Sequence, residues 1–127
     1  MNERADWNSP SDAELKLLRE LWEHGEQSVS DLHERVQEDW PVGYTTVLKL
    51  LQRMTDKRLV TRRPEGRAHL YRPVVGREAT ERRVARSFLR RTFGGSIERL
   101  LQSALPTGRA RRDEIDEIRR LLDRLED

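Results

Sequence analysis

The most informative stretch of this sequence is YTTVLKLLQRMTDK, which occupies residues 44–57. Its apolar side chains recur at i, i+3, i+4 and i+7, the spacing of one buried face of an α-helix. That apolar stripe consists of Val47, Leu50, Leu51 and Met54. The opposite side of the same helix carries hydroxyl, amide and charged side chains. The stretch therefore predicts an amphipathic helix that packs on a core through one face and exposes hydrogen-bonding groups on the other.

The exposed side of this helix has the residue types that read duplex DNA. Thr45 and Thr46 are short hydroxyls at the helix start that can approach a phosphate or a base edge. Lys49 and Arg53 are long donors one turn apart, within reach of guanine or the backbone. A helix-turn-helix protein places such a helix in the major groove. We therefore interpret residues 44–57 as a recognition helix.

Two shorter helices are predicted ahead of it. Residues 11–14, Ser-Asp-Ala-Glu, fit a capping box, and the leucines that follow recur at helical spacing as far as Trp22. Residues 28–31 repeat the capping pattern before a second, short helix. The sequence Trp-Pro-Val-Gly at residues 40–43 then breaks that helix. Three helices in this order complete a helix-turn-helix.

The residues after the recognition helix predict a β-hairpin. Leu59–Arg63 and Arg67–Arg72 read as two strands, and residues 63–66 read as the turn, because Pro suits its second position and Gly its last. Arginines flank the tip, so the hairpin is interpreted as a wing that lies on the DNA backbone. The candidate DNA-binding residues are Tyr44, Thr45, Thr46, Lys49, Arg53, Arg62, Arg63 and Arg67.

The remainder of the chain is predicted to be helical. Glu78–Phe93 reads as one helix with Phe88 facing inward, Ser96 caps a second, residues 106–108 form a break, and Asp113–Leu125 reads as the last. A helix as short as the last is marginal alone and needs a surface that buries its apolar stripe. The residues expected to hold two subunits together are Leu100, Leu101, Ile115, Ile118, Leu121, Leu122 and Leu125.

These elements predict a mainly α fold with a small β-hairpin. Residues 1–76 form an N-terminal winged helix-turn-helix domain, and residues 77–127 form a C-terminal helical dimerisation domain. The charge distribution agrees with this division. Residues 44–77 carry nine Lys or Arg against two Asp or Glu, whereas residues 1–43 carry four against eleven. A basic block within a chain of net charge +2 indicates a polyanionic partner.

The sequence also excludes several classes of function. It has no cysteine, so neither a disulfide nor a thiolate metal site can form. His33-Glu34 begins like a zinc-binding H-E-x-x-H pattern, but Gln37 stands where the second histidine belongs. We therefore expect no enzyme activity, no metal and no cofactor. The polar N-terminus and the absence of a long apolar run predict a cytoplasmic protein without a membrane partner.

Four stretches of the chain have the order and spacing of one known family. Residues 11–22 resemble its opening helix, residues 44–60 its recognition helix, residues 66–73 its wing and residues 113–118 its terminal helix. That family is the penicillinase-repressor (BlaI/MecI/CopY) family of winged-helix transcriptional regulators. The resemblance implies a homodimeric repressor that binds two half-sites of double-stranded operator DNA and controls a β-lactamase-type or related operon.

The resemblance differs from parts of the family in the control of release from DNA. In some members a membrane sensor triggers cleavage of an Asn-Phe bond in the C-terminal region. This chain has no Asn-Phe pair, and an ungapped match places Ser103-Ala104 there, so the identity of an inactivating protease stays unknown. Copper-responsive members carry paired cysteines near the C-terminus, which this chain lacks.

A second class of function also accounts for the basic block. The chain would then be a protein-interaction module whose basic surface binds an acidic protein partner. The two hydroxyls followed by Lys49 at a helix start favour DNA over that alternative. A gel shift with excess nonspecific DNA separates the two.

Overall fold

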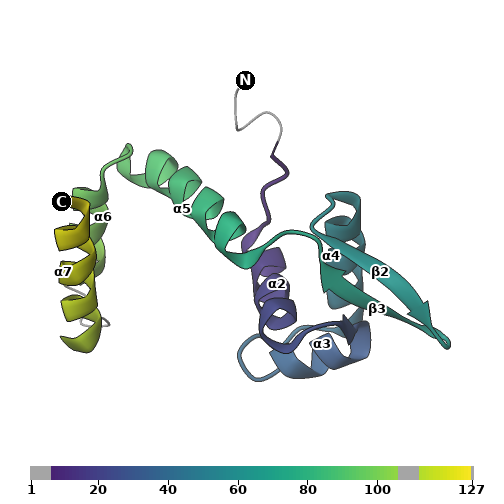
Figure 1. The fold of residues 1–127 in the computed structure, drawn as a ribbon. Coiled ribbons are helices and arrows are strands. Elements are labelled where there is room, and N and C mark those ends of the chain that lie inside the picture. Colours follow the sequence, from purple (N-terminus) through teal and green to yellow (C-terminus); the bar gives the residue numbers. More distant parts are fainter. Residues whose placement is uncertain (1–6, 106–111, 127) are drawn as a thin grey trace. The chain divides into compact units, whose positions relative to one another are not determined.

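The structure, a computed structural model, describes residues 7–105 and 112–126, so the break predicted at residues 106–108 lies outside the described residues. The chain divides into two compact units, Met1–Arg82 and Arg83–Asp127. Figure 1 labels the elements used below. In chain order they are α2 (Asp12–His24), β1 (Gln27–Ser28), α3 (Val29–Val36), α4 (Tyr44–Asp56), β2 (Val60–Glu65), β3 (Ala68–Pro73), α5 (Arg77–Phe93), α6 (Ile97–Ala104) and α7 (Arg112–Glu126).

Helix α2 begins with the capping box that the sequence predicts. The Ser11 hydroxyl accepts a hydrogen bond from the Glu14 N–H at 3.2 Å, and the Glu14 carboxylate accepts one from the Ser11 N–H at 2.8 Å. The helix ends at Gly25, whose N–H donates to the Leu21 carbonyl. Gly25 has φ +83°, a backbone conformation that glycine adopts without strain.

Helices α2, α3 and α4 pack on one another in pairs and enclose the core of the first unit (Figure 1). Ser28 caps α3 by accepting from the Asp31 N–H, as the repeated capping pattern predicts. The predicted stripe of α4 is buried, and the helix ends at Asp56, one residue before the predicted end. The buried core consists of Leu17, Leu18, Leu21, Val29, Leu32, Val36, Val47, Leu50, Leu51, Met54, Leu59, Val60 and Tyr71.

The sheet of the first unit has three strands in the order β1-β3-β2, one strand more than the predicted hairpin. The central strand β3 pairs antiparallel with both neighbours, so that Tyr71 lies opposite Gln27 on one side and Arg62 on the other. Strand β1 has only two residues. A segment of that length is too short for the alternation of side chains that identifies a strand in sequence.

The prediction of a turn at residues 63–66 is wrong. The β2–β3 ladder continues to Glu65 opposite Ala68, so only Gly66 and Arg67 form the turn. Gly66 has φ +60°, which suits the first central position of a two-residue type II′ turn. Pro64 remains within β2 because β2 is an edge strand, where a residue without an N–H is tolerated.

The end of α4 leads the chain directly into the wing. The Leu59 N–H donates to the Met54 carbonyl and the Arg58 N–H to the Thr55 carbonyl, the two bonds of a Schellman motif. Arg58 occupies the left-handed position with φ +64°, which glycine usually fills. Strand β2 begins two residues later, so the backbone of the wing is set by the end of the same helix.

A partly buried ion pair joins the start of α2 to the end of α4. Glu14 is fully buried, and its Oε1 lies 2.7 Å from Lys57 Nζ. Lys57 also donates to the Ser9 carbonyl oxygen at 3.1 Å. The second carboxylate oxygen, Oε2, has no hydrogen-bond partner among the described residues. Removing Lys57 would therefore leave the buried Glu14 carboxylate without its positively charged partner, which is unfavourable in a protein interior.

The second unit holds most of α5 together with α6 and α7. Among its described residues, none in α6 or α7 is buried. Phe88, expected to face inward, is 42% exposed and makes an edge contact with Phe93 of the same helix instead. In the described parts of both units, no helix is sufficiently long and apolar to span a membrane.

The Glu14–Lys57 pair generates a prediction about stability. Lys57→Met should lower the free energy of unfolding by about 3 kcal/mol, because it removes the cation that pairs with the buried Glu14 carboxyl group. Urea denaturation followed by circular dichroism measures the change. The control is Lys49→Met, which removes an exposed lysine from α4 and should shift stability by less than about 0.5 kcal/mol. Equal effects of the two variants would contradict a stabilising role for the pair.

Candidate nucleic-acid interface

The five candidate residues of α4 are all exposed. Tyr44, Thr45, Thr46, Lys49 and Arg53 are exposed, whereas the apolar stripe of the helix is at most 8% exposed. The stripe fixes the rotation of the helix about its axis, which leaves Thr45, Thr46, Lys49 and Arg53 away from the core, while Tyr44 is exposed at the helix start beside His33. The structure therefore brings the predicted recognition residues together.

Side-chain hydrogen bonds hold the turn that precedes α4. The His33 imidazole donates through Nε2 to the Val42 carbonyl at 2.9 Å, and the Gln37 amide donates to the same carbonyl at 2.8 Å. The His33 ring also meets the Tyr44 ring edge-on, with centroids 5.9 Å apart. These contacts fix the first turn of α4, where Thr45 and Thr46 lie. His33 thus acts as a structural residue of the turn.

The register of the wing separates its two neighbouring arginines. Side chains of paired strands alternate between the two faces of the sheet, and Arg62 lies opposite Tyr71 whereas Arg63 lies opposite Leu70. Tyr71 is buried in the core, so Arg62 shares the face that looks toward the helices. Arg63 belongs to the outer face. The two residues, grouped together by sequence reasoning, occupy different environments.

A groove of about 360 Å³ lies between α4, the start of α3 and the wing. The candidates Tyr44, Arg62 and Arg67 line it. Further polar side chains line the same groove and were missed as site residues from the sequence, among them Ser30, Gln52 and His69. A signal for Gln52 existed, since the helical wheel places it opposite the buried stripe. No local pattern marked Ser30 or His69, because the fold alone brings them beside α4.

Arg63 is bound by a carboxylate. Its guanidinium donates to both oxygens of Glu26, with Nη2 to Oε1 at 2.8 Å and Nε to Oε2 at 3.0 Å. The hydrogen bond from Arg63 lowers the pKa of Glu26 from its ordinary value, and the charge of nearby Arg72 lowers it further. Glu26 precedes β1, so this ion pair reaches from one edge of the three-stranded sheet to the other.

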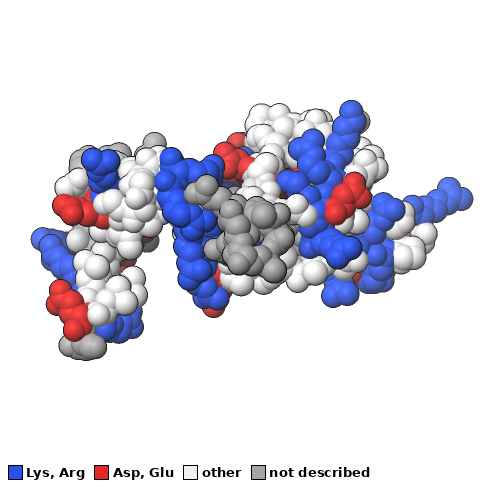
Figure 2. All heavy atoms as spheres, turned by 90° about the horizontal axis from the view of Figure 1, so that it is seen from above, with Lys and Arg blue, Asp and Glu red and all other residues white. Residues whose placement is uncertain are grey.

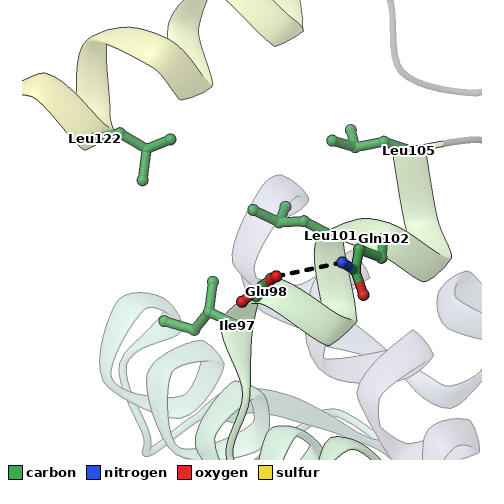
Figure 3. A pocket seen from close by; sticks show the side chains of 6 residues that line it. All are labelled: Ile97, Glu98, Leu101, Gln102, Leu105 and Leu122. Atoms are coloured by element: carbon green, nitrogen blue, oxygen red, sulfur yellow. Dashed lines mark hydrogen bonds between the residues drawn. The ribbon is translucent and has the colours of Figure 1, made fainter.

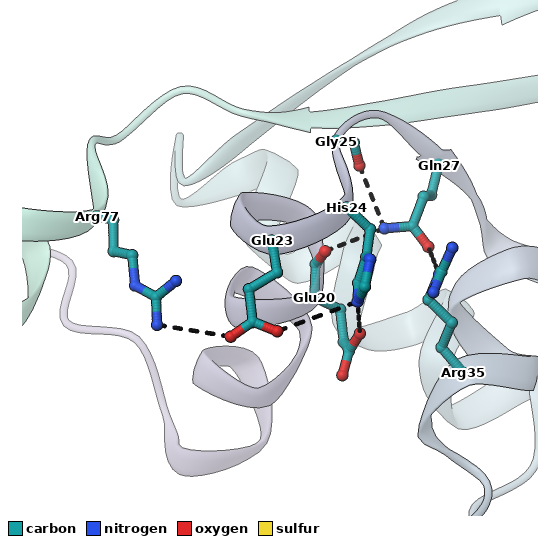
Figure 4. Close-up of polar contacts among 7 residues, drawn as sticks. All are labelled: Glu20, Glu23, His24, Gly25, Gln27, Arg35 and Arg77. Atoms are coloured by element: carbon teal, nitrogen blue, oxygen red, sulfur yellow. Dashed lines mark hydrogen bonds and ion pairs between the residues drawn. The ribbon is translucent and has the colours of Figure 1, made fainter.

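A polar network joins the end of α2, β1, α3 and the start of α5 (Figure 4). The buried Gln27 amide donates to the carbonyls of Glu20 and Gly25, and its oxygen accepts from Arg35 at 2.7 Å. Glu23 lies 3.6 Å from Arg77 at the start of α5. Within this network the Glu23 carboxylate is paired with a cation of α5.

Basic side chains cover much of the first unit and extend to the tip of the wing in the view of Figure 2. Among the predicted site residues, Lys49, Arg53, Arg62 and Arg67 are all exposed. The residues that the structure describes contain no group of three or more side chains suited to hold a metal ion. The arrangement offers a positive, hydrogen-bonding surface made by one helix and a hairpin.

The second unit presents an apolar hollow (Figure 3). It has a volume of about 540 Å³ and is lined on α6 by Ile97 and Leu101 and on α7 by Leu122. Leu121, Leu122 and Leu125 are exposed, while Leu100, Leu101, Ile115 and Ile118 are partly exposed. The predicted dimerisation residues therefore remain accessible within this unit.

Three helices and a two-stranded wing beside an exposed, polar helix face define a winged helix-turn-helix protein. The chain belongs to the penicillinase repressor family, whose family model matches residues 10–124.

Individual relatives agree with this membership. Transcriptional regulator BlaI of Mycobacterium tuberculosis is 40% identical over 68 residues, which are 53% of this chain and 49% of that protein. The chain thus spans about half the length of this mycobacterial relative. The penicillinase repressor of Bacillus licheniformis is 23% identical over 113 residues, covering 89% of this chain and 88% of that protein.

A solved structure has a similar fold. The crystal structure of transcriptional regulator Tm0710 from Thermotoga maritima aligns with a TM-score of 0.52 and 19% identity. The alignment covers 91% of this chain and 73% of that one. At this identity the likeness concerns the fold alone.

The Glu26–Arg63 pair generates a prediction about titration. In the wild-type protein the lowered pKa of Glu26 means that its contribution to stability is present above the ordinary value near 4.5 and is lost as the pH falls through the lowered value. Arg63→Gln should raise the pKa of Glu26 toward 4.5, measured by carboxyl carbon NMR. Arg62→Gln is the control and should leave it in place. A Glu26 pKa that is equal in both variants would contradict the pairing.

Proposed function

We propose that this protein is a transcriptional repressor that binds double-stranded operator DNA through α4 and the wing. The observation that carries the proposal is the exposed face of α4, where two hydroxyls, a lysine and an arginine lie opposite a buried stripe. A helix of this kind fits the major groove, and its cations suit guanine edges or phosphates. Membership of the penicillinase repressor family supports the same function.

The side chains divide into two roles in this proposal. Thr45, Thr46, Lys49 and Arg53 meet base edges and nearby phosphates in the major groove. Tyr44, Arg62 and Arg67 border the groove beside α4 and meet the backbone or the adjacent minor groove. Neutralising phosphates releases counterions, so binding of this kind weakens as salt increases.

We further propose that the protein acts as a homodimer. The apolar side chains of α6 and α7 are partly or largely exposed within their own unit, and a second copy would cover them. Two linked winged domains bind two operator half-sites with an avidity that can exceed that of one domain by ~10²–10⁴. Because two relatives carry the names BlaI and penicillinase repressor, the proposed target is a β-lactamase-type or related operon.

The DNA proposal is tested on α4. Lys49→Ala and Arg53→Ala should each weaken operator binding by about 1–3 kcal/mol where the side chain contacts a base, with relaxed specificity at that base pair. The operator is first selected from random duplexes, and affinity is then measured by fluorescence anisotropy at fixed salt. Arg19→Ala removes an exposed cation from α2 and serves as the control. Wild-type affinity in both α4 variants would mean that another surface binds DNA, or that the basic surface binds an acidic protein.

The dimer proposal is tested on α6. Leu101→Asp should convert the dimer to a monomer, because it would bury a charge in the interface, and should reduce operator affinity by roughly 10²-fold. Ser103→Asp adds the same charge at an exposed position of the same helix and should leave the dimer intact. Sedimentation velocity with parallel anisotropy measures both effects. A wild-type monomer, or a dimeric Leu101→Asp variant, would contradict this interface.

A further inference from the structure

The wing carries two adjacent arginines with different surroundings. Arg62 lines the groove beside α4, and the structure records no ion pair for it among the described residues. Arg63 lies on the outer face of the sheet and forms a two-pronged ion pair with Glu26. Both side chains are positively charged and exposed, so their different surroundings arise from the alternation of side chains along β2.

The Glu26–Arg63 pair spans the sheet. Glu26 comes directly before β1, β3 is the central strand, and Arg63 sits in the opposite edge strand β2. Strand β2 is hydrogen-bonded to β3, and the Glu26–Arg63 pair adds a contact between β2 and the turn after α2. The Glu26 side chain is 26% exposed and that of Arg63 is 55% exposed, so the pair lies at the surface and its Glu26 end is the more enclosed.

The geometry also bears on what Arg63 can bind. Its Nε and Nη2 atoms are both used by the carboxylate, at 2.8–3.1 Å. That edge of the guanidinium is therefore occupied, and an incoming phosphate would meet only the remaining N–H groups of Nη1 and Nη2, beside a charge already partly neutralised by Glu26. Glu65 lies near enough to act electrostatically on the same guanidinium. Arg62 forms no such pair with Glu26 or Glu65 in the described residues, so its guanidinium is available to an incoming anion.

We infer that Arg63 is a positioning residue, which holds the wing through Glu26, while Arg62 and Arg67 supply the wing's contacts to DNA. This inference rests on the proposed DNA-binding function. It replaces the expectation that all three wing arginines bind DNA directly. Arg63 then affects the affinity of the wing for the DNA backbone only indirectly, because it holds β2 in its orientation.

The salt dependence of binding by the full-length protein distinguishes these roles. Arg62→Gln should lower the slope of log affinity against log salt by roughly one per subunit, because a phosphate contact is lost. Arg63→Gln should weaken binding by about two- to fivefold with an unchanged slope, because only an exposed ion pair is lost. A slope that falls by one in Arg63→Gln would overturn the inference.

A charge reversal supplies the second arm. The double variant Glu26→Arg with Arg63→Glu should bind DNA with an affinity within about twofold of wild type. Its affinity should be higher than that of either single variant. An arginine that contacts DNA could not be rescued in this way. Failure of the double variant to bind better than Arg63→Glu would overturn the inference.

Amide hydrogen exchange makes the inference testable apart from DNA. Glu26→Gln and Arg63→Gln should both speed exchange in β2, Arg62→Gln should not, and the charge reversal should restore protection. Equal exchange in all four variants would overturn the positioning role. If the wild-type protein shows no salt-dependent binding to duplex DNA, the proposed function fails, and the exchange data still decide whether Arg63 holds the wing.

Discussion

Burial of the α4 stripe is the contact on which the candidate interface depends. Val47, Leu51 and Met54 have no exposed surface and Leu50 has 8%. Each fully buried side chain of this size contributes roughly 1.5–3 kcal/mol, whereas turning the helix would bury Lys49 or Arg53 at a cost of several kcal/mol. Both terms favour one rotation of α4, the one that leaves Thr45, Thr46, Lys49 and Arg53 in solvent. Presentation of the recognition face is therefore a consequence of core packing.

Electrostatics refines that arrangement through the acidic residues of the first helices. Glu14 neutralises Lys57 inside the unit, and Glu26 binds Arg63 on the outer face of the sheet. Both cations belong to the basic block of residues 44–77, yet neither is available to a ligand in the way that Lys49 or Arg62 is. The basic block thus contains scaffold cations and interface cations. Sequence charge alone overstates the number of contacts that the surface can make with a polyanion.

The sequence predicted the elements whose signals are local. The capping box at Ser11, the stripe of α4 and the presence of a wing are confirmed, since each depends on neighbours within a few residues. Strand β1 was missed and the turn was placed too early, because a two-residue strand has no periodicity and because an edge strand tolerates Pro64. The Glu26–Arg63 pair joins residues 37 positions apart, so no local sequence pattern predicts it. The roles of the individual site residues and of the C-terminal apolar face stay predictions.

The central claim is that duplex DNA meets the exposed face of α4 and the groove beside the wing. Titration of the isotopically labelled full-length protein with a selected duplex, followed by amide and side-chain NMR, tests it most directly. We predict that the largest shift changes occur at Thr45, Thr46, Gln52 and Gly66, with small changes along α2. Changes concentrated on the acidic residues of α2 and α3, or none at low salt, would contradict the account.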